Sequence, residues 1–183
     1  MIIGFAGSIA SGKSVVAKAV ADTMGVPYVS FGGAVRSEAE VRGLEPSRTT
    51  LQDLGNELIA QGWDRLWARV IDQVNWDHRS SLVVDGIRHL GAIAIIRQSA
   101  TPSRFYLIFV STPPGHRRSR LLERGWTCAE ARMADQHPTE KELPAVRDRA
   151  DLLIDNDGGL SETTAIVVSA LRELDDPSRP GEV

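Results

Sequence analysis

Residues 2–14 read Ile2-Ile3-Gly4-Phe5-Ala6-Gly7-Ser8-Ile9-Ala10-Ser11-Gly12-Lys13-Ser14. From Gly7 onward this stretch fits the pattern G-x-x-x-x-G-K-[ST] at every fixed position, which is typical of a loop that binds phosphate groups. The apolar run before the loop predicts a buried strand, and residues 15–20 after it predict a helix. Because the pattern requires this strand-loop-helix setting, the sequence predicts a nucleoside triphosphate site rather than a glycine turn without a ligand.

The residue types in this loop explain how it would hold ATP. Glycines allow successive backbone N–H groups to converge on the phosphates, and the N-terminus of the following helix adds its positive dipole. Lys13 is expected to reach the β- and γ-phosphates, and Ser14 is expected to ligate Mg²⁺ through its hydroxyl group. ATP and Mg²⁺ are therefore expected together. The loop residues expected to contact ATP are Gly7, Ser8, Ala10, Ser11, Gly12, Lys13 and Ser14.

Length, composition and charge limit the class of protein. The chain has 183 residues, 42% of them hydrophobic, which suffices for one well-packed domain and is short for two. We expect this domain to span residues 1–174 and residues 175–183 to form a flexible tail. The net charge of −3 argues against binding to a nucleic-acid polymer or a membrane surface. A single cysteine, Cys128, excludes an internal disulfide, and Met1 leads directly into a strand without a signal-peptide pattern, so a cytoplasmic location is expected.

Apolar segments alternate with helical patterns along the rest of the chain. Strands are expected at residues 2–6, 27–30, 81–85, 105–110 and 152–154, each apolar in the manner of a parallel strand that is buried on both faces. This alternation predicts an α/β fold of the P-loop NTPase type, with a five-stranded parallel sheet in three layers. Leucines at helical spacing predict a helical insertion at about residues 31–80, with Thr50 and Asp53 as an N-terminal cap and Pro46 as a break before it.

Polar residues follow the third predicted strand. Asp85 stands at its carboxyl end and would face the phosphates across the crevice at this edge of the sheet. It is expected either to ligate Mg²⁺ through a water molecule or to act as a base, and a turn-forming Asp-Gly pair is the alternative. Arg88, just beyond, would bind the phosphate of an acceptor bidentately.

A second group of candidate site residues begins with an arginine-rich run at residues 117–124. Arg120 and Arg124 lie one helical turn apart and would stabilise the transferring phosphoryl group, whereas the alternative is a solvated basic face. Residues 125–145 suggest a short helical lid that carries Arg132 towards the site and excludes water when it closes. Gln136 in this segment is assigned to acceptor binding.

The turn after the second predicted strand reads Ser30-Phe31-Gly32-Gly33-Ala34-Val35-Arg36 and opens a helix. It would lie beside the phosphate loop and present Arg36 to an acceptor. A glycine-rich turn with an exposed arginine explains the same residues equally well.

These motifs resemble those of P-loop kinases of the nucleoside monophosphate kinase and dephospho-CoA kinase group, over the chain up to about residue 172. The runs 120–136 and 150–158 are similar to the lid and final strand of dephospho-CoA kinases. In that family the segment after the last strand lies near the adenine, which implies that Asn156 and Gly158 contact ATP. The runs 31–36, 51–55 and 85–88 look more like nucleotide kinases.

The residues after the second strand bear on the acceptor. Dephospho-CoA kinases phosphorylate a hydroxyl group and carry carboxylates at this place, where this chain has no acid. An acceptor phosphate is already anionic and needs positioning and charge neutralisation more than a base. We therefore expect ATP-dependent phosphorylation of a nucleoside or deoxynucleoside monophosphate, with a dephospho-CoA-kinase-like hydroxyl kinase that uses Asp85 as base as the alternative.

A second alternative comes from another class of protein, a regulatory ATPase that engages a macromolecule. It is motivated by Trp63, Trp67 and Trp76 in the insertion, since exposed tryptophans often anchor interfaces. Packing of these side chains in the core explains them more simply. The sequence determines neither the base and sugar of the acceptor nor the oligomeric state.

Overall fold

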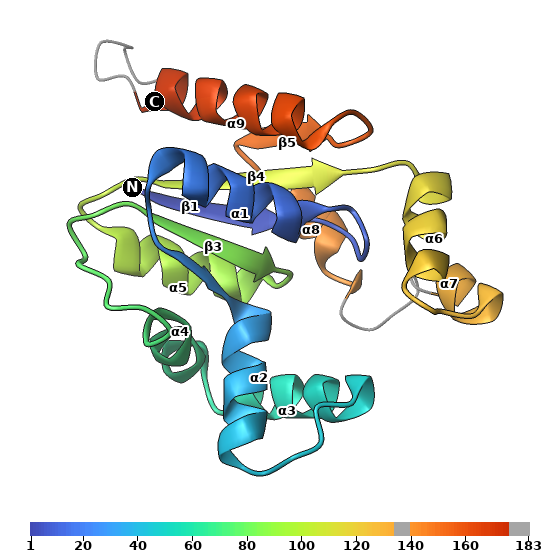
Figure 1. Cartoon of the computed structure of the whole chain (residues 1–183). Helices are drawn as coiled ribbons and strands as arrows, with labels where there is room; N and C mark the ends of the chain where they lie inside the picture. The colour runs from blue at the N-terminus through green and yellow to red at the C-terminus, as the bar shows by residue number, and fades with distance from the viewer. Residues whose placement is uncertain (134–139, 176–183) are drawn as a thin grey trace.

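The computed structural model describes residues 1–133 and 140–175 (Figure 1). The strands are β1 (Ile2–Ala6), β2 (Tyr28–Ser30), β3 (Leu82–Ile87), β4 (Phe105–Ser111) and β5 (Leu152–Asp155). The helices are α1 (Lys13–Met24), α2 (Phe31–Val41), α3 (Arg48–Ala60), α4 (Trp63–Ile71), α5 (Leu90–Ala100), α6 (Pro114–Glu123), α7 (Cys128–Met133), α8 (Leu143–Arg147) and α9 (Leu160–Leu174).

The strands form one parallel sheet in the order β2-β3-β1-β4-β5. Ile2 of β1 pairs with Leu82 of β3 and with Phe105 of β4, so these three strands begin level with one another. Their carboxyl ends therefore meet at one edge of the sheet, where Ser30 at the end of β2 pairs with Asp85 of β3. The phosphate loop follows β1 at this same edge, which brings the candidate residues together.

Helices cover both faces of this sheet (Figure 1). Helices α1 and α9 bury apolar side chains such as Val20 and Val167 against one face, whereas α5 and α8 bury Ile96 and Val146 against the other. The predicted three-layer α/β fold with a five-stranded parallel sheet is thus confirmed. Each strand lies where the sequence predicts it, although β3 continues past Asp85 because a bulge opposite β1 lets the pairing resume at Ile87.

The predicted helical insertion is formed by α2, α3 and α4, and α3 begins earlier than expected. Ser47 is its N-cap and accepts a hydrogen bond from the Thr50 backbone N–H at 3.2 Å. Thr50 therefore lies inside the helix, and the prediction that it is the cap was wrong. Ser47 takes this role because it directly follows Pro46 and its hydroxyl group reaches the free N–H groups of the first turn.

The tryptophans of the insertion belong to its packing. Trp67 is 4% exposed within the main apolar core, and Trp63 and Trp76 are half-buried against that core. This contradicts the interpretation of the three residues as exposed interface anchors, so the hypothesis of a regulatory ATPase loses the observation that motivated it.

The last described helix, α9, ends at Leu174. Of the tail expected at residues 175–183, only Asp175 lies within the described residues. No helix in residues 1–133 or 140–175 is long and apolar enough to cross a membrane.

Candidate functional site

The phosphate loop joins β1 to α1, and its backbone requires both fixed glycines of the sequence pattern. Gly7 and Gly12 have φ angles of 149° and 84°, which residues with a Cβ atom rarely adopt. A Cβ atom on Gly7 would clash with the carbonyl oxygen of Val110, and one on Gly12 would clash with the side-chain amide of Asn156. Both positions therefore require glycine, because the φ angles are positive and because neighbouring atoms leave no space for a Cβ atom.

Side chains from distant segments hold this loop in place. Asn156, buried just after β5, donates from Nδ2 to the carbonyl oxygen of Ser11 at 2.8 Å. Thr112 Oγ1 donates to the same oxygen at 2.8 Å, and Arg120 Nη1 donates to the Ala10 carbonyl at 3.3 Å. The side chain of Asn156 thus supports the loop backbone, while its expected closeness to adenine stays a prediction.

Lys13 is a buried cation at the centre of the site, with 8% of its surface exposed. Burial, and after it the positive charge of Arg88, lowers the pKa of Lys13 from 10.5 to about 8. The negative charges of Asp85 and Glu140 act in the opposite direction, and the charge of Arg124 lowers the pKa a little further. These four charged groups therefore surround Lys13 at short range.

Asp85 is buried near the carboxyl end of β3, at 4% exposure. Tyr28 donates from its hydroxyl group to Asp85 Oδ2 at 2.9 Å, whereas Asp85 Oδ1 is buried with no hydrogen-bond partner among the described residues. A buried oxygen without a partner is unfavourable, so it indicates a site for a cation or a donor. Oxygen ligands are those that Mg²⁺ prefers, and the Ser14 hydroxyl lines the same cavity. The two predicted metal-binding residues therefore fit the ion.

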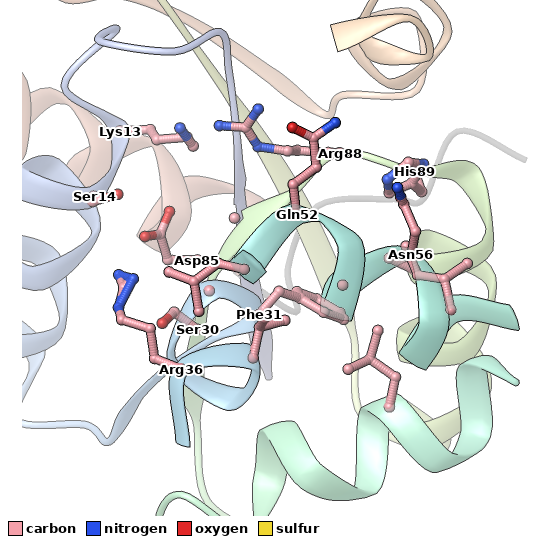
Figure 2. Close-up of a pocket in the computed structure, with 18 of the residues that line it drawn as sticks. Lys13, Ser14, Ser30, Phe31, Arg36, Gln52, Asn56, Asp85, Arg88 and His89 are labelled. Carbon is pink, nitrogen blue, oxygen red and sulfur yellow. The ribbon is translucent and has the colours of Figure 1, made fainter. Parts of the chain in front are cut away.

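A cavity of about 490 Å³ extends from the phosphate loop into the insertion (Figure 2). Its charged and hydroxyl-bearing lining comprises Lys13, Ser14, Lys18, Tyr28, Ser30, Arg36, Asp85 and Arg88. Its apolar and aromatic lining comes mainly from α2, α3 and α4 and includes Phe31, Val35, Leu51, Ile59, Trp63 and Leu66. The cavity therefore offers one end that suits phosphate groups and another that suits a flat, uncharged group.

Two amide side chains in the cavity were not predicted from the sequence. Gln52 and Asn56 lie one turn apart on α3 and line the part of the cavity enclosed by the insertion (Figure 2). Neither makes a side-chain hydrogen bond with the described residues. The helical spacing of residues 51–55 marks this face of α3, but it does not show that the face borders a cavity.

The two arginines assigned to the acceptor differ in their surroundings. Arg36 on α2 is exposed and has no ion pair among the described residues, whereas Arg88 forms an ion pair with Glu140. The Glu140 side chain is 5% exposed, and its second oxygen accepts the backbone N–H of Ile9 in the phosphate loop at 3.2 Å. Glu140 thus links Arg88 to the loop. No sequence pattern pointed to Glu140, because the segment that carries it is far from both partners along the chain.

The arginine-rich run and the predicted lid at about residues 125–145 are only partly brought to the loop. Arg120 contacts it as described, and Arg124 is exposed but close enough for its charge to affect Lys13. Arg132 is exposed on α7 and makes no ion pair with the described residues. Gln136 lies outside the described residues. Gly158 is exposed beyond β5, and its role in ATP binding stays a prediction.

The turn between α6 and α7 contacts the insertion. Trp126 in this turn packs beside Ala10 of the loop and Ala131 of α7. The guanidinium group of Arg48, the first residue of α3, lies 4.0 Å from the centroid of the Trp126 ring. The segment predicted as a lid therefore meets helix α3 of the insertion through a cation–π contact.

Comparisons with known proteins agree with this architecture. A family model described as "AAA domain" matches residues 6–140. The chain is 42% identical over 125 residues to a UPF0200 protein of Methanothrix thermoacetophila, which covers 68% of this chain and 66% of that protein. It is 30% identical over 180 residues to a UPF0200 protein of Methanoregula boonei, which covers 95% of this chain and 97% of that protein.

Solved structures share the fold at low sequence identity. Shikimate kinase from Bacteroides thetaiotaomicron superposes with a TM-score of 0.61 at 16% identity, covering 95% of this chain and 97% of that chain. This similarity extends to the arrangement of the sheet and helices and carries no information on the acceptor. The narrower resemblance to nucleoside monophosphate and dephospho-CoA kinases stays a prediction.

Proposed function

Because this chain belongs to the UPF0200 family and to the AAA domain family and has the fold of a P-loop kinase, we propose that it is an ATP-dependent phosphotransferase. Its acceptor is a small phosphorylated molecule, most simply a nucleoside or deoxynucleoside monophosphate. One observation carries the proposal: a single cavity joins the phosphate-loop lysine and Asp85 to two arginines and to an aromatic lining.

The donor end is built for the phosphate chain of ATP. Lys13 lies buried where it needs a counter-charge, and the β- and γ-phosphates supply one. Ser14 and Asp85 would hold Mg²⁺, which neutralises phosphate charge when bound. Arg120 lies against the loop and offers its planar guanidinium group to the nucleotide, while Arg124 and Arg132 are proposed to approach the transferring group when the lid segment closes.

The acceptor end suits a nucleoside monophosphate. Arg36, which has no ion pair among the described residues, is free to bind the acceptor phosphate, and Arg88 lies across the cavity from it (Figure 2). Phe31 and Trp63 pack edge to face at 6.4 Å between ring centroids, and this aromatic wall suits a planar base. The amides of Gln52 and Asn56 can both donate to and accept from the polar edge of a base.

The reaction then needs positioning and charge neutralisation more than proton removal. An oxygen of the acceptor phosphate attacks the γ-phosphorus of ATP, the bond to the bridging oxygen of ADP breaks, and a nucleoside diphosphate forms. Lys13 and Arg88 flank this path and stabilise the negative charge on the transferring group. Because the acceptor oxygen is already anionic, Asp85 is not required as a base and remains available to the metal.

A hydroxyl acceptor is the second candidate, and one observation favours it. Asp85 lines the cavity, and its Oδ1 has no hydrogen-bond partner among the described residues, so this carboxylate would accept the proton of an attacking hydroxyl group. In that case dephospho-CoA or a similar molecule would be phosphorylated, and Asp85→Asn would abolish the chemical step rather than weaken the binding of Mg²⁺ with ATP.

The proposal is tested by incubating the purified protein with ATP, Mg²⁺ and a panel of ribo- and deoxynucleoside monophosphates plus dephospho-CoA. Formation of ADP and of the phosphorylated product is followed by mass spectrometry. Turnover that depends on a monophosphate supports the leading proposal, and turnover with dephospho-CoA alone supports the second candidate. Slow ATP hydrolysis that no acceptor accelerates would contradict both.

A matched pair of arginine variants tests the acceptor site. Arg36→Ala should raise the KM for the monophosphate about tenfold or more and leave the KM for ATP nearly unchanged, since a charge-assisted contact to phosphate is lost. Arg79→Ala is the control, because Arg79 is exposed before the start of β3, at the opposite edge of the sheet. Equal effects of the two substitutions would argue against an acceptor phosphate at Arg36.

A further inference from the structure

The two oxygens of the Asp85 carboxylate have different surroundings. Oδ2 accepts a hydrogen bond of 2.9 Å from the Tyr28 hydroxyl group, and Oδ1 is buried without a partner among the described residues. A carboxylate with two equivalent oxygens could rotate about its last bond and present either one. The contact with Tyr28 removes this equivalence, so a single oxygen is left for a ligand.

The position of Tyr28 follows from the register of the sheet. Tyr28 of β2 pairs with Val83 of β3, and Asp85 lies two residues beyond Val83. Since alternate residues of a strand share a face, Tyr28 and Asp85 point to the same side of the sheet. The Tyr28 ring thus lies along the strand direction towards the carboxylate, and Lys18 of α1 contacts that ring with Nζ 5.5 Å from its centroid.

We propose that Tyr28 is a positioning residue for the metal-binding carboxylate: its hydroxyl group holds Asp85 Oδ2, so that Oδ1 faces the Mg²⁺ that accompanies ATP. This inference rests on the proposed role of Asp85 in binding that ion. Tyr28 has no part in the sequence motif and touches neither the phosphate loop nor an acceptor-binding arginine by any hydrogen bond among the described residues. Its contribution to ATP binding should therefore appear only when the metal is present.

The test measures ATP binding by titration calorimetry, with Mg²⁺ and with EDTA, and without any acceptor. In the wild-type protein Mg²⁺ should strengthen ATP binding. Tyr28→Phe keeps the ring and its Lys18 contact, and it should reduce this strengthening about tenfold while ATP affinity in EDTA stays unchanged. Tyr106→Phe is the matched control, because Tyr106 is the other tyrosine of the chain and donates to the Leu174 carbonyl at 2.9 Å, in the packing of α9.

The double variant Tyr28→Phe/Asp85→Asn separates an effect through Asp85 from a general structural effect. If Tyr28 acts through the carboxylate, the double variant should bind ATP and Mg²⁺ no worse than Asp85→Asn alone. Additive losses would overturn the proposal, as would equal weakening of ATP binding with Mg²⁺ and with EDTA. A thermal melt of each variant verifies that the protein is folded.

The outcomes also separate this inference from the proposed function. If Asp85→Asn weakens Mg²⁺-dependent binding and Tyr28→Phe does not, the positioning role of Tyr28 is refuted and the metal role of Asp85 stands. If Asp85→Asn has no effect on Mg²⁺-dependent binding, both the metal role and this inference are refuted. Because no acceptor is present, failure to find phosphotransfer leaves these binding results unaffected.

Discussion

Lys13→Met should stabilise the ligand-free protein while removing the residue on which ATP binding depends. Lys13 is 8% exposed, and its burial is the main cause of a pKa lowered from 10.5 to about 8. Each pH unit between the folded and unfolded pKa corresponds to about 1.4 kcal/mol. Keeping Lys13 protonated at pH 7 therefore costs the folded protein about 3 kcal/mol.

Methionine has a similar length and no charge, so the substitution should remove most of this cost. We expect the free energy of unfolding at pH 7 to rise by about 3 kcal/mol, which is an increase of about 6–12 °C in Tm for a chain of this size. Lys141→Met is the matched control, because Lys141 is exposed and its replacement should change stability by less than about 0.5 kcal/mol.

The pH dependence of the free energy of unfolding tests independently whether protonated Lys13 destabilises the folded protein. Below about pH 8 the folded protein keeps the proton on Lys13 and carries the whole cost. Between about pH 8 and 10.5 the folded state loses this proton while the unfolded state still holds it, so the free energy of unfolding of the wild type should rise with pH. The Lys13→Met protein lacks this rise, and the difference between the two proteins should shrink across that interval.

Urea unfolding of both proteins at a series of pH values, followed by circular dichroism, measures these quantities. ATP with Mg²⁺ should stabilise the wild type and not the variant, since the phosphates no longer find a cation at this position. A Lys13→Met protein that is no more stable than the wild type at pH 7, with the same pH dependence above pH 8, would refute the reasoning.

Three further substitutions test the surroundings of the loop and the acceptor arginines. Asn156→Ala removes the amide that donates to Ser11, so it should lower the free energy of unfolding by about 2 kcal/mol and weaken ATP binding. Urea unfolding measures the first effect and titration calorimetry the second. An unchanged ATP affinity would contradict the supporting role of Asn156. Arg88→Gln leaves the buried Glu140 carboxylate without its cation and should lower the free energy of unfolding by about 2 kcal/mol. Adding Glu140→Gln should restore most of this loss, which a double-mutant cycle of unfolding free energies would show. Arg36→Lys should retain the charge but lose bidentate geometry, so the KM for the acceptor should rise about threefold to tenfold in steady-state assays, and a larger loss in kcat than in KM would argue against this role.

The sequence predicted the parts of the molecule that depend on local pattern. The loop motif needs only consecutive residues, and the apolar runs that form the strands are each contiguous. Asp85 could be placed at the site because parallel strands end at one edge of a sheet, whichever neighbours they have. The fold and the donor end of the site follow from these local features.

The remaining residues of the site depend on contacts between distant segments. Glu140 belongs to the site only because it contacts Arg88 and the loop backbone. Tyr28 belongs to it only because the register of β2 against β3 brings its hydroxyl group to Asp85. Gln52 follows the same helical pattern whether its face borders a cavity or solvent. The error at Thr50 has a local cause, since two hydroxyl residues three positions apart compete for the cap and the structure uses Ser47.

The most direct measurement follows the γ-phosphoryl group itself. The protein is incubated with Mg²⁺, ATP labelled with ¹⁸O in the γ-phosphoryl group, and the monophosphate that gives the fastest turnover. The masses of the products are then measured by mass spectrometry. The account predicts the label in the terminal phosphate of the nucleoside diphosphate formed from the acceptor, with loss of this product in Lys13→Ala. Label found only in inorganic phosphate, at a rate that the monophosphate does not change, would contradict the claim that this cavity transfers phosphate from ATP to a small phosphorylated acceptor.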